Sequence, residues 1–378
     1  MSDLNLMYNK QDIQLWIEDT QNSDFLTVIG TDGEEGDFYG IGPYFTCYIL
    51  FEEGQANNLI KSMIDLFHRF NEIKNEPWTW FGDLTYEKMI QAEKFDLKNL
   101  EKNCLKRYDQ EGYLTFNAST SIDSEYSSAV WGLDFSLSFR AEMSYSTFKV
   151  NFRNAWYKNN KENQKIWQDY VAHCLSVLKP MHAYSGFEIA TAPMGHIGSY
   201  AYSILEKIAS DHFYGLDIDH PFSMGYHNHN RADGYVDSSA LGAGIKTPVW
   251  SFMLSPYWLD KLNKTIDDIY IYFKAFSEVT ITKIEYPNFK IGLWIQLGEL
   301  SLYPKENGLP PLIVYANKLI KPIRCDYLKL TIMDRWEGDD NPCFDYESSL
   351  AWMRRFDVDE SETQVEVKKI RPNNLFIP

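Results

Sequence analysis

Apolar residues recur three and four positions apart in several stretches of the chain, as they do along one face of an amphipathic helix. Residues 56–73 show the pattern most clearly, with Leu59, Met63 and Phe70 on one face. A second stretch, 163–178, ends at a Lys-Pro pair, because the residue before proline avoids the helical conformation. The spacing predicts helices at 56–73, 86–102, 163–178, 199–212, 257–262 and 310–320.

Runs of bulky or alternating residues between these stretches predict strands. Three of them, at 113–119, 129–139 and 146–157, follow one another without a helix and indicate an antiparallel meander. Residues 25–53 have the pattern of two strands joined by an acidic, glycine-rich loop. Further strands are predicted at 186–192, 249–254, 270–286 and 289–298. Since strands and helices alternate irregularly, we expect an α+β fold with mostly antiparallel sheets flanked by helices.

The 378 residues are enough for one large domain or two tightly joined halves. We expect an N-terminal hairpin-helix portion at 1–110, a core at 111–325 packed with it as one unit, and a charged, mobile C-terminal extension at 326–378. The pattern leaves open whether the two halves share one strand-strand-helix plan.

The charge balance excludes some partners. Acidic residues outnumber basic ones 53 to 36, a formal net charge of -17, which repels phosphate backbones and anionic membranes and attracts basic proteins. Direct nucleic-acid binding and membrane binding are therefore not expected. Five widely spaced cysteines without a CxxC pair indicate reduced thiols. With no signal-like N-terminus and no apolar run of about 18 residues, the sequence predicts a cytoplasmic protein.

Histidines are concentrated in one part of the chain, seven of the eight lying between 173 and 229. His227 and His229 are two positions apart, as imidazoles that share one face of a strand and hold zinc would be. The surrounding residues 223–239 are rich in Asn, Gly, Asp and Ser, however, which predicts a polar loop with solvated histidines. We expect no metal ligand, and a metal-dependent hydrolase using the His-rich loop 212–229 stands as an alternative.

Other catalytic patterns are incomplete. Residues 242–247 (GAGIKT) place Ile245 between glycine and lysine and continue toward a strand, unlike a phosphate-binding loop, so the glycines are expected to serve close packing. The chain contains no Gly-x-Ser-x-Gly elbow. Aromatic residues make up 16% of the chain, which makes a carbohydrate-binding module a further alternative. We expect no catalytic residue and no cofactor.

Two blocks of the chain carry a family signature. The first contains Tyr214-Gly215-Leu216-Asp217, and the second contains Gly244-Ile245-Lys246, then Trp250 and Phe252, then Ser255-Pro256 at the start of a helix. This order and spacing resembles the immunity proteins encoded beside type VI secretion effectors. Residues 179–193 and 291–302 resemble further blocks of that family, so the likeness covers roughly 110–325.

The resemblance implies an immunity protein that binds and neutralises a cognate effector toxin, by occluding its active site, and is not an enzyme. With the net charge, it makes two acidic loops, 32–37 and 337–340, candidates for reaching a basic cleft if the toxin is a nuclease. Polar loop residues near the signature are expected at the surface, whereas Trp250, Phe252 and Leu254 are expected in the core. The candidate partner-binding residues are Asp32, Glu34, Glu35, Asp37, Asp219, His227, His229, Arg231, Glu337, Asp339 and Asp340.

Overall fold

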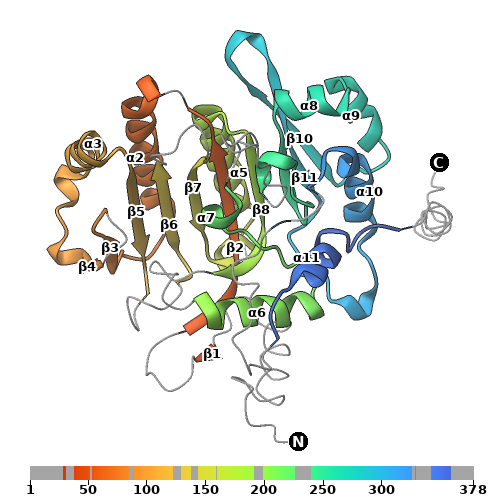
Figure 1. Ribbon diagram of the computed structural model, residues 1–378, viewed down its shortest axis with the longest axis horizontal. Helices are drawn as coiled ribbons and strands as arrows, with labels where there is room; N and C mark the ends of the chain where they lie inside the picture. The colour runs from red at the N-terminus through yellow and green to blue at the C-terminus, as the bar shows by residue number, and fades with distance from the viewer. Residues whose placement is uncertain are drawn as a thin grey trace, which may run out of the picture.

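An antiparallel sheet forms the centre of the molecule (Figure 1). The computed structural model describes residues 29–30, 38–51, 53–84, 88–121, 129–137, 144–158, 160–190, 199–225, 240–325, 328 and 342–358. Within these residues the sheet has eleven strands in the order β10-β11-β9-β8-β2-β7-β6-β5-β3-β4, with β1 also paired to β2, and all ladders between them are antiparallel. The strands are β1 (Ile29–Gly30), β2 (Phe38–Ile49), β3 (Trp80–Gly82), β4 (Met89–Gln91), β5 (Leu114–Ser119), β6 (Gly132–Leu137), β7 (Ser146–Asn151), β8 (His182–Ala190), β9 (Ser251–Leu254), β10 (Val279–Glu285) and β11 (Ile291–Leu297).

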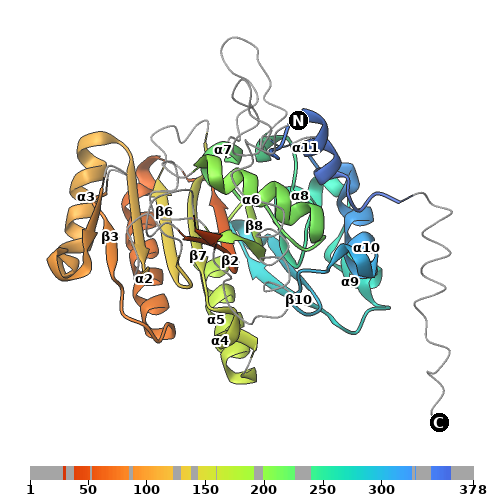
Figure 2. The same ribbon diagram turned by 90° about the horizontal axis from the view of Figure 1, so that it is seen from below.

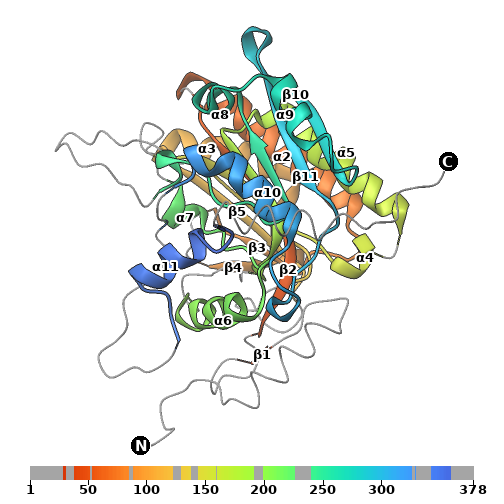
Figure 3. The ribbon, with the colours of Figure 1, turned by 90° about the vertical axis from the view of Figure 1, so that its right-hand side faces the viewer.

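Helices cover both faces of the sheet (Figure 2). Helices α2 and α5 pack together on one face, and α10 and α11 lie on the other, as the view along the sheet in Figure 3 also shows. The α-helices are α2 (Ala56–Ile73), α3 (Leu100–Glu111), α4 (Asn154–Lys158), α5 (Lys161–Leu178), α6 (Ser199–His212), α7 (Pro221–Met224), α8 (Pro256–Leu262), α9 (Ile266–Phe273), α10 (Pro311–Ile320) and α11 (Tyr346–Met353).

Strand β2 joins the two apolar cores that these layers enclose. Because side chains alternate across a strand, Phe45 and Cys47 pack into the core under α2 and α5. Tyr44 and Tyr48 point the other way, into the core beneath α10 and α11. The face that carries Tyr44 and Tyr48 is called the tyrosine face below.

The α+β class and the antiparallel arrangement are confirmed, including the meander, which appears as β5, β6 and β7 in sequence order. The helix at 56–73 has the predicted bounds, and the helices predicted at 163–178 and 199–212 are α5 and α6. β1 pairs with β2 as the N-terminal hairpin requires, while its acidic loop lies outside the described residues.

Three local predictions are wrong. Instead of a helix at 86–102, the chain forms β4 and two short 3-10 turns, and α3 begins only at Leu100. The strand predicted from 146 ends at Asn151, where α4 soon follows. The strand predicted from 270 begins at Val279, because a capping box between Thr265 and Asp268 starts helix α9 first.

The prediction of a mobile C-terminal extension is also wrong for residues 342–358. Helix α11 buries Trp352 and Met353 in the core of the tyrosine face. Thr247 donates a hydrogen bond to the Met353 carbonyl at 2.7 Å, and Arg324 forms two hydrogen bonds to Asp357 at 2.7 and 2.9 Å. Apolar residues spaced among the charges pack this segment against the rest of the fold. The domain boundaries at 110 and 325 stay a prediction.

Candidate functional site

The two signature blocks meet on the tyrosine face. After α6 the chain runs beside β8, where the Asp217 amide donates to the Phe187 carbonyl at 2.7 Å. Lys246 enters from the second block, and its Nζ lies 3.1 Å from a carboxylate oxygen of Asp217 and 3.1 Å from one of Asp219. The same ammonium donates to the Ile218 carbonyl at 3.0 Å. The aspartate of one signature block and the lysine of the other are thus a buried ion pair.

A second lysine extends this pair into a network. Lys149 on β7 lies 2.7 Å from Glu188 on β8 and 3.4 Å from Asp219. Asn151 donates to the other oxygen of Glu188 at 3.0 Å. Two ammonium groups therefore face three carboxylates, and all five side chains are buried. We call Lys149, Glu188, Asp217, Asp219 and Lys246 the charged network.

Tyrosines close the remaining sides of the charged network. Tyr44 donates to Asp217, and Tyr48 donates to Asp219 at 2.8 Å. The Tyr184 hydroxyl accepts the Lys246 backbone amide at 3.0 Å. These hydrogen bonds offset part of the cost of removing the carboxylates from water.

Burial and the ammonium groups shift the titration of the network in opposite directions. Burial, only partly opposed by Lys149, raises the pKa of Glu188 to about 7. Burial also acts on Asp219, but there Lys246 and Lys149 outweigh it and hold the pKa well below its usual range. Burial opposes the charge of Lys149, yet Glu188 and Asp219 raise its pKa above the ordinary value. Asp219 and Lys149 therefore stay ionised at neutral pH.

The charged network fixes the fold and does not face a partner. Its groups are at most 6% exposed, so neither a substrate nor another protein reaches them. What it can do is hold the signature segments against β7 and β8, because each segment supplies one sign of charge. Arg355, beyond α11, adds to this by donating to the Tyr214 and Leu216 carbonyls at 3.3 and 3.5 Å.

Two signature glycines serve close packing, which was predicted for Gly244 but not for Gly215. A Cβ on Gly215 would lie 2.4 Å from the Ser301 carbonyl oxygen. One on Gly244 would lie 2.6 Å from the Cys325 amide nitrogen. Both clashes are with backbone, which cannot move aside, so only glycine fits.

Two described histidines near the signature, His182 and His220, have structural partners. His182 lies between the hydroxyls of Tyr145 and Tyr184, at 3.2 and 3.0 Å. His220 lies 2.8 Å from Glu206. Across the described ranges, no group of three or more His, Cys, Asp and Glu side chains is arranged to hold a metal ion.

The candidate partner-binding residues have different outcomes. The prediction that Asp219 lies at the surface is wrong: its side chain is fully buried, since Lys149 and Lys246, distant in sequence, converge on it. The core prediction for Trp250, Phe252 and Leu254 is confirmed. The other candidates lie outside the described residues, and their roles stay predictions: Asp32, Glu34, Glu35, Asp37, His227, His229, Arg231, Glu337, Asp339 and Asp340.

Lys149 and Glu188 were not singled out from the sequence. The available signal was a lone charge inside each of two otherwise uncharged strands, TFKVNF and GFEIA. A charge flanked by buried residues needs a partner of opposite charge in the fold, so the sequence could have predicted that Lys149 pairs with Glu188.

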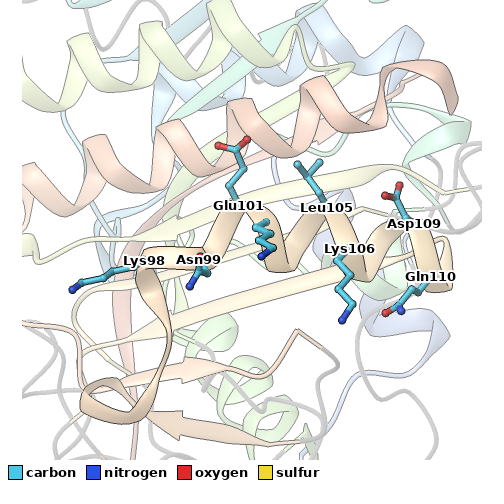
Figure 4. A pocket seen from close by; sticks show the side chains of 8 residues that line it. Lys98, Asn99, Glu101, Leu105, Lys106, Asp109 and Gln110 are labelled. Atoms are coloured by element: carbon cyan, nitrogen blue, oxygen red, sulfur yellow. The ribbon is translucent and has the colours of Figure 1, made fainter.

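A hollow of about 550 Å³ on the outer side of α3 offers no comparable chemistry (Figure 4). It is lined by residues 98–110, all from α3 and the turn before it, and the side chains in Figure 4 diverge along the helix. Lys106 and Asp109 show its mixed charge, without convergent groups that would define a ligand.

Comparison with known proteins defines the class. Residues 62–356 match the family model TsiV, described as type VI immunity for VRR-NUC. This match covers most of the chain, so the protein belongs to the TsiV family of type VI immunity proteins.

A solved structure supports the fold. The Pseudomonas aeruginosa T6SS protein PA0821 aligns over 96% of this chain and 95% of its own, with a TM-score of 0.73. At 16% identity this likeness concerns the fold alone. No curated protein matches the chain.

Proposed function

We propose that this chain binds a cognate type VI effector of the VRR-NUC class and neutralises it by covering its active site, without catalysis of its own. The observation that carries the proposal is the family match over residues 62–356. That range contains all five residues of the charged network and both signature blocks. The part of the chain that the family model matches therefore contains every strand of the described sheet except β1 and β2.

The arrangement of charged groups favours inhibition by binding. In the described part of the tyrosine face, the three acids and two lysines of the charged network pair with one another in the interior. An antidote needs none of them at the surface, because it works through affinity over an interface of roughly 1,200 to 2,000 Å². Its working residues are then surface side chains carried by a rigid sheet.

The net charge favours a basic partner. A nuclease must attract phosphates, and a chain of formal charge -17 competes for the same positive surface. We propose that the acidic loops 32–37 and 337–340 contribute to this attraction. Electrostatic steering of this kind raises association rates by roughly 10 to 1,000-fold at low salt.

The proposed compartment follows from the proposed target. A nuclease effector damages DNA inside the cell, so an antidote is needed in the cytoplasm. Within the described residues, no helix has both the length and the apolar character to span a bilayer.

A titration tests binding against catalysis. The effector is mixed with increasing amounts of this chain, and cleavage of a DNA substrate is measured. Occlusion predicts that cleavage falls in proportion to the added chain and stops near a fixed stoichiometric ratio, with both proteins unmodified by mass spectrometry. Complete inhibition by a small fraction of an equivalent, or a covalent change in the effector, would show an enzymatic mechanism instead.

A further inference from the structure

A groove of about 580 Å³ lies where four adjacent strands of the sheet end or begin. β2 and β9 end at this edge, and β8 and β11 begin there, because neighbours in this part of the sheet are antiparallel. The chain segments after β2 and β9 and before β8 and β11 therefore converge. Helices α2, α5 and α8 supply the remaining walls. We call this site the strand-end groove.

The strand-end groove differs in charge from the whole chain. Among the residues that the structure describes, its lining includes Lys179 and Lys290 but no aspartate or glutamate. The chain as a whole has 53 acids against 36 bases. A locally basic hollow on an acidic protein complements a carboxylate on a partner.

Exposed apolar side chains also line the strand-end groove. Leu50, Val177 and Tyr257 line it with 41%, 38% and 45% of their surfaces exposed. They come from three different segments of the chain, so the fold, and not one local run, brings them together. Exposed apolar side chains that converge in this way are typical of binding sites.

The β10–β11 hairpin carries a fourth apolar side chain beside the strand-end groove. Its turn contributes Pro287 and Lys290 to the lining, and Phe289 between them is fully exposed. Asn288 and Phe289 have φ of 60° and 58°, a left-handed conformation that is rare for a bulky residue. The hairpin projects beyond its neighbours in Figure 1 and Figure 3. An exposed aromatic held in such a conformation is suited to anchor a partner.

We propose that the strand-end groove and Phe289 are the docking surface for the effector, and that they receive a segment in which an apolar side chain is flanked by carboxylates. This inference rests on the proposed function and adds the surface and the local chemistry of the partner. Apolar side chains of the segment fill the hollow between Leu50, Val177 and Tyr257, and Lys179 and Lys290 pair with its carboxylates. The net negative charge steers the encounter, whereas this basic surface sets the register of the complex.

The chain offers matched controls for the test. Val177 and Ile166 lie on the same helix, α5, with 38% and 40% exposure, and only Val177 lines the groove. Val177→Glu and Ile166→Glu therefore add the same charge at equal exposure. Lys290→Glu is paired with Lys106→Glu on the hollow at α3. Phe289→Ala, which removes a fully exposed side chain, is paired with Ile271→Ala, which removes one that is 69% exposed.

The measurement is the Kd for the proposed cognate effector, by calorimetry or biolayer interferometry, with folding of each variant checked by circular dichroism. We expect Val177→Glu, Lys290→Glu and Phe289→Ala each to raise Kd at least about tenfold. The three controls are expected to change Kd less than about twofold. Since Phe289 supports nothing else in the fold, its variant reports binding even if Val177→Glu loses stability.

Two failures are distinguishable. If the unaltered chain binds the effector and the groove variants match their controls, the docking proposal is overturned and the proposed function stands. If the unaltered chain does not bind the effector, the proposed function fails and the docking proposal falls with it.

Discussion

Replacing Lys246 with methionine tests whether the charged network holds the signature segments. Methionine keeps most of the side-chain volume and removes the ammonium that lies 3.1 Å from both Asp217 and Asp219. The carboxylate of Asp217 then keeps Tyr44 and the Ile218 amide as partners, and Asp219 keeps Lys149. Neither aspartate is more than 1% exposed, so water does not replace the lost charge.

The expected cost is large. Removing one partner of a buried ion pair costs about 3 to 5 kcal/mol, because the remaining charge stays in a medium that solvates it poorly. That is a substantial share of the 5 to 15 kcal/mol by which domains are usually stable. We expect urea unfolding, followed by tryptophan fluorescence, to show this loss for Lys246→Met, while Lys106→Met on exposed α3 stays within about 0.5 kcal/mol of the unaltered chain.

A double variant separates charge from packing. In Lys246→Met with Asp217→Asn, one uncompensated carboxylate is also removed, so we expect part of the stability to return. The losses of unfolding free energy in Lys246→Met and Asp217→Asn, added together, should then exceed the loss in the double variant by about 1 to 3 kcal/mol. A loss below about 1 kcal/mol for Lys246→Met alone would refute the reasoning, since the ammonium would then be dispensable where the structure places it.

Three further predictions concern separate features of the molecule. Because burial raises the pKa of Glu188 to about 7, the folded chain keeps a proton that the unfolded chain releases above about pH 4.5. The contribution of this proton to stability is therefore lost as pH rises through 7. Between pH 5 and 8, the unfolding free energy of Glu188→Gln should increase relative to that of the unaltered chain, and a constant difference between the two would contradict this. Gly244→Ala, whose Cβ would lie 2.6 Å from the Cys325 amide, should lower stability by about 1 to 3 kcal/mol in thermal unfolding, whereas Gly54→Ala, with nothing within 4 Å, should not; equal melting temperatures would remove the packing argument. Changing Glu34 and Glu35 to lysine should slow association with the effector and weaken its salt dependence, and unchanged kinetics would place that loop outside the interface.

The sequence predicted the elements whose apolar pattern is local. Helix α2 has the predicted bounds because its buried side, including Leu59 and Phe70, repeats at helical spacing. Helix α9 was missed because its start depends on a capping box at Thr265, while its residues Ile269 to Phe273 also suit a strand.

The site was harder to predict because its contacts are remote in sequence. Asp217 and Lys246 were identified through a family resemblance, but their pairing depends on the path of the chain after α6. Lys149 reaches Asp219 across 70 positions, which no local pattern encodes. The strand-end groove likewise combines Leu50, Val177 and Tyr257 from three segments, so it emerges only when the sheet is assembled.

The most direct test of the central claim is a co-expression rescue followed by co-purification. The gene of the proposed cognate effector is induced in a sensitive host with and without this chain, and survival and complex formation are measured together. The account predicts survival only with this chain, and a stable complex that can be isolated from the surviving cells. Death of the host despite well-expressed chain, or survival without any complex, would contradict neutralisation by binding.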